Sequence, residues 1–387
     1  MENCLKSVTI RGYKTIRELE NFEPGPLTVL IGPNGAGKSN FISFFQMLSR
    51  MLAPPGNLQV YVAEQGGASA LLHDGSSKTK EIDCELELAG TQSKYSFQLA
   101  LAGGDSLYYA KEAFIIPVMH LPSRDSILDI FELGSGHRES RLVLSEDTLR
   151  LCGPTALLEG NKLKSAEFGK IMLYLLRAVN VFQFHNTSAS ARIRSKWNMH
   201  DGRWLKEDAA NIAPFLRRLR ESEPGYYQRI VDAIRLIIPF FADFQLEPEY
   251  NSLLLCWREH KSDRVFNVSQ ASDGMLRVMA LVALLLQPQK DLPRVLILDE
   301  PELGLHPHAI SIIAGLIKSA SLNTQVIVAT QSAALVDYFD PEDIVVVERE
   351  GRESLFTRLN PDALGDWLKE YSLSELWEKN VIGGRPA

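Results

Sequence analysis

A glycine-rich segment that follows a short apolar run constrains this chain more than any other feature. Residues 32–39 read GPNGAGKS and match the pattern GxxxxGK[ST] in full, directly after the strand-like run 27–31. Apolar residues then recur at spacings of three and four over 41–48, which predicts a helix. Glycines let backbone N–H groups curl around phosphate oxygens, and the start of a helix adds a partial positive charge. The order strand, glycine loop, helix therefore predicts a phosphate-binding loop rather than an ordinary glycine-rich turn.

The residue types in this loop indicate what each member does. We expect Lys38 to bridge the outer phosphates of a nucleoside triphosphate and Ser39 to reach Mg²⁺. The backbone of the loop and the first residues of the helix complete the site. The candidate nucleotide-binding residues are Gly32, Pro33, Asn34, Gly35, Ala36, Gly37, Lys38, Ser39 and Asn40.

Two adjacent carboxylates follow a second apolar run. The string RVLILDEPE is apolar over 295–298 and places Asp299 and Glu300 at the end of the predicted strand. Two carboxylates are costly to hold there unless a positive charge lies nearby. A Mg²⁺ ion held by Asp299 supplies that charge, and it leaves Glu300 free to polarise an attacking water as general base. The alternative is a strand followed by an acidic turn without a function.

In a third segment, ASDGMLR, residues 272–274 precede an apolar helix predicted over 275–287. The hydroxyl of Ser272 and the backbone N–H groups at Asp273 and Gly274 form another anion site at a helix start. Found alone, the same string would indicate only an N-cap before a buried helix. The interpretation of this segment as an anion site depends on its position between the glycine loop and the carboxylate pair.

Strand-like segments lie at both ends of the chain, and helix-like segments lie in the middle. Alternating segments within 58–118, separated by glycine-containing turns, predict an antiparallel β-meander. Buried-strand runs with a helix between them near the C-terminus predict a parallel sheet. We expect one nucleotide-binding core with a large insertion: an N-terminal lobe over 1–118, a mainly helical insertion lobe over 119–264 and a C-terminal lobe over 265–387.

Composition and charge limit the ligands and the cellular location that we expect for this chain. The 387 residues include 41 Lys and Arg against 48 Asp and Glu, a formal net charge of −7. Any affinity for nucleic acid therefore has to come from a local basic patch. The 4 cysteines form no CxxC pair, and the longest apolar run, 278–286, is far shorter than the ~20 residues of a membrane-spanning helix. Because the N-terminus shows no secretory signal, we expect a cytoplasmic protein with no membrane partner.

Four strings taken together resemble a known group of ATPases. GPNGAGKS, ASDGM, LILDEPELGLHP and ATQSAALVDYF, in that order, resemble the ABC-type ATPase heads of the RecF, SMC and OLD group. The resemblance spans the chain and is most specific to small bacterial predicted ATPases with a DEPELGLHP stretch and a C-terminal YSLxELWxxNxxGGRP tail, here residues 371–386. It implies an α/β P-loop NTPase fold of ABC-ATPase head type, with a mixed or parallel core sheet, an antiparallel β-meander and a helical insertion lobe. It also implies that ATP and Mg²⁺ bind.

The resemblance implies a second copy of the chain at the active site. ASDGM stands where ABC proteins carry LSGGQ, so Ser272 and Gly274, with Asp273 between them, would contact the γ-phosphate of ATP bound to the other subunit. The assembly that this implies is a head-to-tail homodimer with two ATP molecules between the subunits.

The same resemblance assigns three polar residues to the nucleotide site. Arg11 and Lys14 stand where SMC-like heads have a basic residue near the nucleotide. Gln183 is a counterpart of the glutamine loop that reaches the metal ion and joins the core to the helical lobe. The alternatives are a solvated strand edge for the two basic residues and the outer face of a strand for Gln183.

One position departs from the pattern of these ATPases. These ATPases usually have a histidine after the strand that follows the one ending in the catalytic carboxylates. This sequence has Gln331 at that position. Glutamine can donate a hydrogen bond to the γ-phosphate, yet it carries neither a transferable proton nor a charge near pH 7. We expect Gln331 to act in catalysis with Glu300 and Lys38. Hydrolysis should persist at an altered rate, with no histidine contribution to its pH dependence from this position.

The middle of the chain holds a basic segment with interleaved tryptophans. Basic side chains spaced with flat aromatic rings suit a phosphate backbone and stacked bases, so DNA is a candidate ligand. The alternative is a solvated loop whose tryptophans anchor it to the helical lobe. The residues concerned are Arg192, Arg194, Lys196, Trp197, Arg203, Trp204 and Lys206, followed by RRLR at 217–220.

These features favour an ATP-driven switch, in which ATP closes a homodimer, hydrolysis opens it and the helical lobe transmits the change to DNA or to a partner protein. Relatives in the RecF, SMC and OLD group act in DNA repair, chromosome handling and antiphage defence, several of them with a nuclease. Few residues follow the last predicted core strand at 343–349, so we expect a nuclease or toxin effector to be a separate chain. The alternatives are a P-loop phosphotransferase acting on a small molecule and a transporter ATPase subunit. A GTP switch is disfavoured because the chain lacks an NKxD string.

Overall fold

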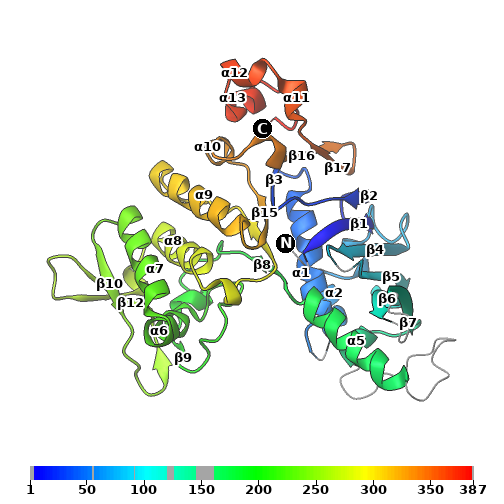
Figure 1. The fold of residues 1–387 in the computed structure, drawn as a ribbon, viewed down its shortest axis with the longest axis horizontal. Helices are drawn as coiled ribbons and strands as arrows, with labels where there is room; N and C mark the ends of the chain where they lie inside the picture. Colours follow the sequence, from blue (N-terminus) through cyan, green and yellow to red (C-terminus); the bar gives the residue numbers. More distant parts are fainter. Residues whose placement is uncertain (1–3, 55, 91, 120–125, 145–160, 386–387) are drawn as a thin grey trace.

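Two six-stranded sheets and a lobe of helices form the main body of the structure (Figure 1). The computed structural model describes residues 4–54, 56–90, 92–119, 126–144 and 161–385. One six-stranded sheet holds the glycine loop at its edge, the other packs on the helix that follows this loop, and the helices cover the remaining face of the first sheet.

The core sheet joins strands from distant parts of the chain. Its order is β17-β16-β3-β15-β14-β8, and every neighbouring pair except β17 and β16 is parallel. Each residue of β3, β14 and β15 is buried, as expected for strands covered on both faces. Their carboxyl ends meet along one side of the sheet, which we call the carboxyl edge. The bounds are β3 Leu27–Ile31, β8 Val179–Phe182, β14 Val295–Asp299, β15 Gln325–Ala329, β16 Ile344–Glu350 and β17 Glu353–Arg358.

The second sheet is antiparallel, with the order β2-β1-β4-β5-β6-β7. Burial alternates along β4, so one face is packed and the other is more exposed. Helix α1 (Lys38–Met51) fills the space between the packed face and the core sheet, where Phe44 lies edge-on to Tyr13 and stacks with Phe97. The bounds are β1 Leu5–Tyr13, β2 Ile16–Phe22, β4 Glu81–Leu88, β5 Lys94–Ala102, β6 Ser106–Met119 and β7 Ser126–Gly134.

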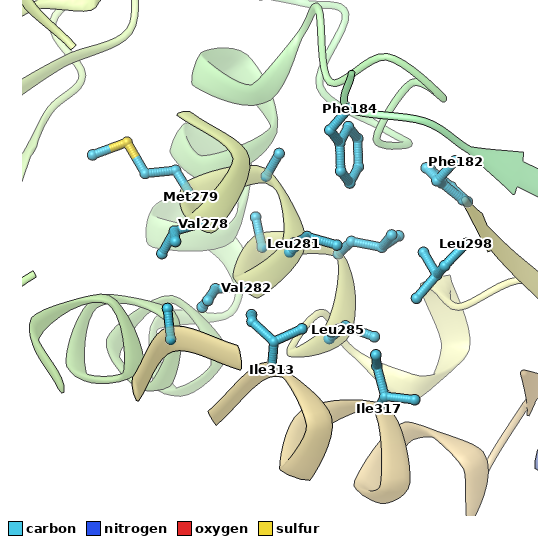
Figure 2. Close-up of a cluster of buried hydrophobic side chains, with 14 of the residues drawn as sticks. Phe182, Phe184, Val278, Met279, Leu281, Val282, Leu285, Leu298, Ile313 and Ile317 are labelled. Carbon is cyan, nitrogen blue, oxygen red and sulfur yellow. The ribbon is translucent and has the colours of Figure 1, made fainter. Parts of the chain in front are cut away.

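The helical lobe is organised around α8, which is buried almost all round, as its apolar run predicts. Figure 2 shows Leu281 and Leu285 of α8 in one cluster with Ile313 and Ile317 of α9 and with Leu298 of β14. This packing ties the lobe to the strand that carries Asp299. The bounds are α6 Ile212–Ser222, α7 Pro224–Ile237, α8 Asp273–Leu285, α9 Pro307–Ser321, β10 Phe241–Gln245, β12 Cys256–Glu259 and β13 Val265–Asn267.

Ten further helices and strands belong to the described chain. They are α2 Leu58–Glu64, α3 Ala68–Leu71, α4 Arg141–Leu144, α5 Asn161–Leu176, β9 Trp197–Asn198, β11 Ser252–Leu253, α10 Ala333–Val336, α11 Pro361–Leu364, α12 Trp367–Glu370 and α13 Leu373–Glu378. Among the described residues, no helix has both the length and the apolar composition needed to span a membrane.

The structure confirms the predicted α/β P-loop fold and differs from the sequence analysis in two local features. The first part of the predicted meander, up to residue 71, forms the helices α2 and α3. Within 119–264, expected to be mainly helical, β7 completes the antiparallel sheet and β8 completes the core sheet. Distant partners determine the conformation of these strands, and local sequence does not reveal them. The division into lobes at 1–118, 119–264 and 265–387 stays a prediction.

Candidate nucleotide-binding site

The glycine loop lies at the carboxyl edge between β3 and α1, as the sequence predicts. Gly37, the N-cap of α1, has a φ of +120°, and a Cβ atom there would overlap the hydroxyl of Ser354. Glycine fits both this backbone conformation and this close neighbour. Within the described residues, no side chain caps α1, and its first turn holds no acid. The start of the helix is therefore open to an anion.

Lys38 is buried and folds back over the loop. Its Nζ donates to the carbonyl oxygens of Gly32, at 2.5 Å, and of Pro33, at 3.1 Å. Burial lowers the pKa of Lys38, while the negative charges of Glu300 and Asp299 act in the opposite direction. The ammonium group thus lies where the glycine loop and the two adjacent carboxylates come together, the place predicted for the outer phosphates.

Two hydroxyl groups that the sequence analysis did not single out support the loop. Ser354 Oγ on β17 lies 2.6 Å from both the Ala36 carbonyl oxygen, to which it donates, and Thr15 Oγ1. Thr15 Oγ1 also accepts a hydrogen bond from Asn40 Nδ2 at 2.7 Å. Asn40, predicted to bind nucleotide, is therefore engaged with the turn between β1 and β2. A glycine at position 37 is a local sign that another group approaches the loop closely. It does not reveal which distant residue that is.

Asp299 and Gln183 come together at the carboxyl edge. Gln183, one residue after β8, donates through Nε2 to Asp299 Oδ2 at 2.6 Å. His185 Nε2 donates to the Asp299 carbonyl oxygen at 2.9 Å. Burial raises the pKa of Asp299, an effect that His185 and the Gln183 hydrogen bond oppose. The structure thus joins Gln183 to Asp299 and adds His185, which sequence reasoning missed.

The oxygen donors at this edge fit Mg²⁺. Asp299, Gln183 and the exposed Ser39 offer carboxylate, amide and hydroxyl oxygens, the donor types of magnesium sites. In the part of the chain that the structure describes, no group of three or more His, Cys, Asp or Glu residues could hold a metal ion by itself. Mg²⁺ usually binds through one or two carboxylates together with substrate phosphates, and this donor set matches that arrangement.

Glu300 and Gln331 contact each other across neighbouring strands. Gln331 Nε2 donates to Glu300 Oε1, and the backbone N–H of Glu300 donates to the Ala329 carbonyl oxygen at 2.8 Å. Glu300 has a φ of +43°, a conformation that non-glycine residues rarely adopt and that is often found at functional sites. The two predicted catalytic side chains are therefore adjacent, beside the end of β14.

The signature segment, residues 271–275, begins the buried helix of the other lobe. Ser272 is the N-cap of α8, and its Oγ accepts a hydrogen bond from the Met275 backbone N–H at 3.2 Å. Ser272 and Asp273 are exposed, and Gly274 is half-buried. Figure 1 places α8 in the helical lobe and α1 beside the antiparallel sheet. Ser272 is thus an N-cap, as the plainer interpretation says, and its side chain is also exposed to solvent.

Two arginines join the signature segment to the loops at the carboxyl edge. Arg277 on α8 donates to the carbonyl oxygens of Phe184, His185 and Leu303, at 3.0 to 3.1 Å. Arg194 donates to the carbonyl oxygens of Thr187 and Ala271 and pairs with Asp273 at 3.0 Å. The segment after Gln183, the loop after Glu300 and the start of α8 are consequently linked by hydrogen bonds. Sequence reasoning did not find Arg277.

The two basic residues assigned to the nucleotide differ in position. Lys14 Nζ reaches α1, donating to Ser43 Oγ at 3.1 Å and to Gln65 Oε1 at 3.2 Å, and burial lowers its pKa. Arg11 instead pairs with Glu20, whose hydrogen bond raises the arginine pKa. Its side chain lies on the exposed face of the antiparallel sheet, opposite the buried residues that pack on α1. The geometry favours the solvated alternative for Arg11.

Most charges of the basic segment have acidic partners in the same chain. Arg192 pairs with Asp208 at 3.0 Å, Lys196 with Glu249, and Lys206 with Asp201 at 3.2 Å. Trp197 donates its indole N–H to Asp201 at 2.8 Å. Arg217 and Arg218 are paired as well. This pairing favours an anchored surface loop, and binding of nucleic acid stays a prediction.

Comparison with known proteins agrees with the fold. The family model described as "AAA domain, putative AbiEii toxin, Type IV TA system" matches residues 27–143 and 176–337, a range that includes the glycine loop, the signature segment and Asp299 to Gln331. The crystal structure of an SmcHead bound to the C-winged helix domain of ScpA has a TM-score of 0.54 at 14% identity, covering 94% of this chain and 99% of that chain. A Smc head domain with an extended coiled coil, bound to the C-terminal domain of ScpA derived from Pyrococcus furiosus, gives 0.54 at 13% identity, covering 95% and 98%.

A search of curated proteins gives no match. At such low identities the solved structures establish the fold alone, which is a P-loop NTPase fold like that of SMC heads. The family model, in contrast, matches well over half of the chain. The chain therefore belongs to this family of AAA-type ATPase domains.

Proposed function

We propose that this chain binds ATP together with Mg²⁺, hydrolyses it, and uses the cycle to close and open a head-to-tail homodimer. One observation carries the proposal. Lys38, Asp299 and the hydrogen-bonded pair Glu300 and Gln331 converge at the carboxyl edge, next to a helix start that no side chain of the described residues caps. A phosphate grip beside a carboxylate pair is the arrangement that hydrolysis of a triphosphate needs.

The side chains divide the chemistry among them. The glycine loop and Lys38 would hold the outer phosphates, and Glu300 would take the proton of the attacking water. Ser39, Asp299 and Gln183 would hold Mg²⁺, which neutralises charge on the phosphates. The buried position of Asp299 supports this assignment, because a cation relieves the cost of a buried carboxylate.

Gln331 would keep Glu300 in its role as base. Its amide N–H donates to the Glu300 carboxylate, which orients that group without competing for the proton. The second N–H of the same amide would donate to the γ-phosphate when nucleotide binds. A neutral glutamine therefore replaces the usual histidine as a positioning group, and the pH dependence of hydrolysis should come from groups other than residue 331.

The position of the signature segment supports the dimer. Ser272 and Asp273 are exposed at the start of α8, in the lobe opposite the antiparallel sheet. A helix start with an exposed serine suits a γ-phosphate. In a head-to-tail arrangement, the segment of one copy would cover the nucleotide held by the glycine loop of the other. Arg277 on α8 is hydrogen-bonded to the carbonyl oxygens of Phe184 and Leu303, in the segments next to Asp299 and Glu300. A movement of these segments would therefore move the helical lobe.

We place this switch in DNA repair or antiphage defence, acting with a separate nuclease or toxin effector. The description of the family names a toxin of a toxin–antitoxin system, which supports the defence role. In the solved structures, the SMC heads are bound to domains of a separate protein, ScpA, which supports a partner in trans. DNA is a further candidate ligand, although the ion pairs of the basic segment do not favour it.

Product analysis tests the proposal. Purified protein with ATP and Mg²⁺ should release ADP and free phosphate in equal amounts, and Glu300→Gln should release neither above background. If ADP formed without free phosphate in the presence of a small-molecule acceptor, the phosphotransferase alternative would replace hydrolysis. Equal turnover by the unchanged protein and Glu300→Gln would contradict the proposed base.

A further inference from the structure

The C-terminal tail, residues 371–385, is folded onto the core sheet. Ser372 and Glu375 form a capping box at the start of α13, and Trp377 on that helix is fully buried. Two glycines, Gly383 and Gly384, follow with positive φ values. The tail carries the YSLxELWxxNxxGGR pattern and takes no part in the chemistry proposed for the nucleotide site.

The tail ends against the glycine loop. Trp377 donates its indole N–H to the Gly384 carbonyl oxygen, and the Gly384 backbone N–H donates to Glu348 Oε1 at 2.8 Å. Glu348 lies on β16, the strand that pairs with β3. A Cβ atom at Gly384 would lie 2.5 Å from Val346 Cγ1 and 3.6 Å from the Cα of Gly32. Gly384 is therefore packed between β16 and the first residue of the glycine loop.

The tail also contacts the helix that follows Gln331. Ser374 donates from its backbone N–H to Asp337 Oδ1 at 2.8 Å and from its hydroxyl to Asp337 Oδ2 at 2.6 Å. Asp337 ends α10, a helix of one turn that begins directly after Ser332. One continuous segment thus touches the phosphate-binding side of the site at Gly32 and the hydrolysis side through α10.

We propose that the C-terminal tail is a positioning element of the nucleotide site, which holds Gly32 and α10 in a fixed relation. Gly32 opens the loop that curls around the phosphates, so a shift of its Cα changes the direction of the backbone N–H groups that follow. A shift of α10 moves Gln331 relative to Glu300. The inference rests on the proposed function, since it concerns the same ATP site. Simple core packing predicts a loss of stability when the tail is changed, whereas a positioning role predicts a separate loss of ATP affinity.

Two matched glycine substitutions separate these effects. Gly384 and Gly351 have φ values of +59° and +60°, so alanine strains the backbone equally at both, but no atom lies within 4 Å of a Cβ at Gly351. Gly384→Ala should weaken ATP binding about tenfold, measured as Kd with a fluorescent ATP analogue, while Gly351→Ala stays within about twofold of the unchanged protein. Both should lower the melting temperature through backbone strain, and Gly384→Ala should lower it more because its Cβ also meets Val346. Equal Kd values for the two variants would overturn the role of the tail.

Trp377→Phe provides a second measurement that does not depend on the folding of Gly384→Ala. Phenylalanine keeps most of the buried ring but lacks the N–H that holds the Gly384 carbonyl, so ATP affinity should fall about threefold. Ser374→Ala removes the hydroxyl bond to Asp337 and should lower kcat about fivefold with Kd unchanged. Unchanged Kd in Trp377→Phe, or unchanged kcat in Ser374→Ala, would contradict the respective contact. Failure of the unchanged protein to bind ATP would overturn the proposed function and the tail's role together, whereas equal affinities contradict the tail alone.

Discussion

The carboxyl edge and the signature segment carry the two halves of the same proposed site, yet they differ in how complete they are. At the carboxyl edge, side chains at the end of β14 and in the segments after β8, β14 and β15 already contact one another: Gln183 bonds to Asp299, and Gln331 bonds to Glu300. At the signature segment, Ser272 caps its own helix and faces solvent. The first half is assembled within one copy, and in the proposed dimer the second copy would complete the other half.

Because of this difference, we expect ATP binding to need only one copy and ATP hydrolysis to need two. A single copy holds the glycine loop, Lys38 and the carboxylates, so it should bind ATP by itself. The signature segment would add contacts to the γ-phosphate only when a second copy arrives. Changes at the carboxyl edge should therefore affect single copies, and changes at the signature segment should affect only the assembled state.

The largest effect is expected for Lys38→Ala. The variant removes the buried ammonium that lies over the glycine loop, and with it the proposed charge-assisted contact with phosphate. ATP affinity should fall about 100-fold or more, measured by equilibrium binding. Lys78→Ala, at an exposed lysine paired with Asp74, serves as the control and should bind ATP normally. Normal ATP binding by Lys38→Ala would contradict the proposal that the nucleotide binds at the carboxyl edge.

Glu300→Gln should leave binding intact and lower kcat by about 10²- to 10⁴-fold, the usual contribution of a general base. The amide keeps the size of the side chain and a hydrogen-bonding contact with Gln331, so only the proton acceptor is lost. Steady-state phosphate release and equilibrium binding measure the two quantities separately. A loss of affinity equal to the loss of rate would show that Glu300 binds the substrate rather than activates water.

Ser272→Ala tests the other half of the comparison. Loss of the N-cap should cost about 1 kcal/mol of stability, which any exposed cap would share. Asn360→Ala, at the exposed N-cap of α11, is the matched control. Only Ser272→Ala should lower ATP turnover, by about tenfold, while ATP affinity of the single copy stays unchanged. If both variants keep full turnover, Ser272 is an N-cap and nothing more.

The ion-paired basic segment should contribute little to nucleic-acid binding. Replacing Arg192 and Lys196 with glutamine breaks two surface pairs, at a cost of about 1 kcal/mol or less. The slope of log affinity for duplex DNA against log salt should stay unchanged. A slope that flattens by about 0.9 per residue would instead show phosphate contacts. Arg194 is left intact because it holds the signature segment in place.

The smallest effect is expected for Glu302→Gln. Burial raises the pKa of Glu302, and its Oε2 has no hydrogen-bond partner among the described residues. A carboxyl group with a raised folded-state pKa binds its proton more tightly when folded, so its ionisation lowers stability as pH rises through that pKa. The variant should melt about 1 to 2 °C higher at pH 8, with a smaller gain at pH 4. A lower melting temperature at pH 8 would show that the charge of Glu302 stabilises the fold.

Local patterns predicted the carboxyl edge well because each motif combines a strand with the loop that follows it. The apolar runs before Gly32 and Asp299 are buried strands of one parallel sheet, so their ends had to meet. The place of Gln331 next to Glu300 follows from the same topology. Gln183 was assigned through resemblance alone, and its bond to Asp299 depends on the pairing of β8 with β14.

Contacts between residues distant in sequence were not predictable in this way. Ser354 and Thr15 support the glycine loop from β17 and from a turn in the antiparallel sheet, and no local pattern relates them to Gly37. Arg11 looked like a nucleotide contact, but strand alternation turns it to the exposed face. The basic segment looked unpaired because acids such as Glu249 lie far from it in the chain. Charge counted along a sequence does not show which charges are neutralised in the fold.

The central claim is that two copies close around ATP, and the mass of Glu300→Gln in solution tests it most directly. With ATP and Mg²⁺, light scattering should give twice the mass of one chain, and without nucleotide or with Lys38→Ala added to the variant it should give the mass of one chain. A single-chain mass at saturating ATP would contradict the account.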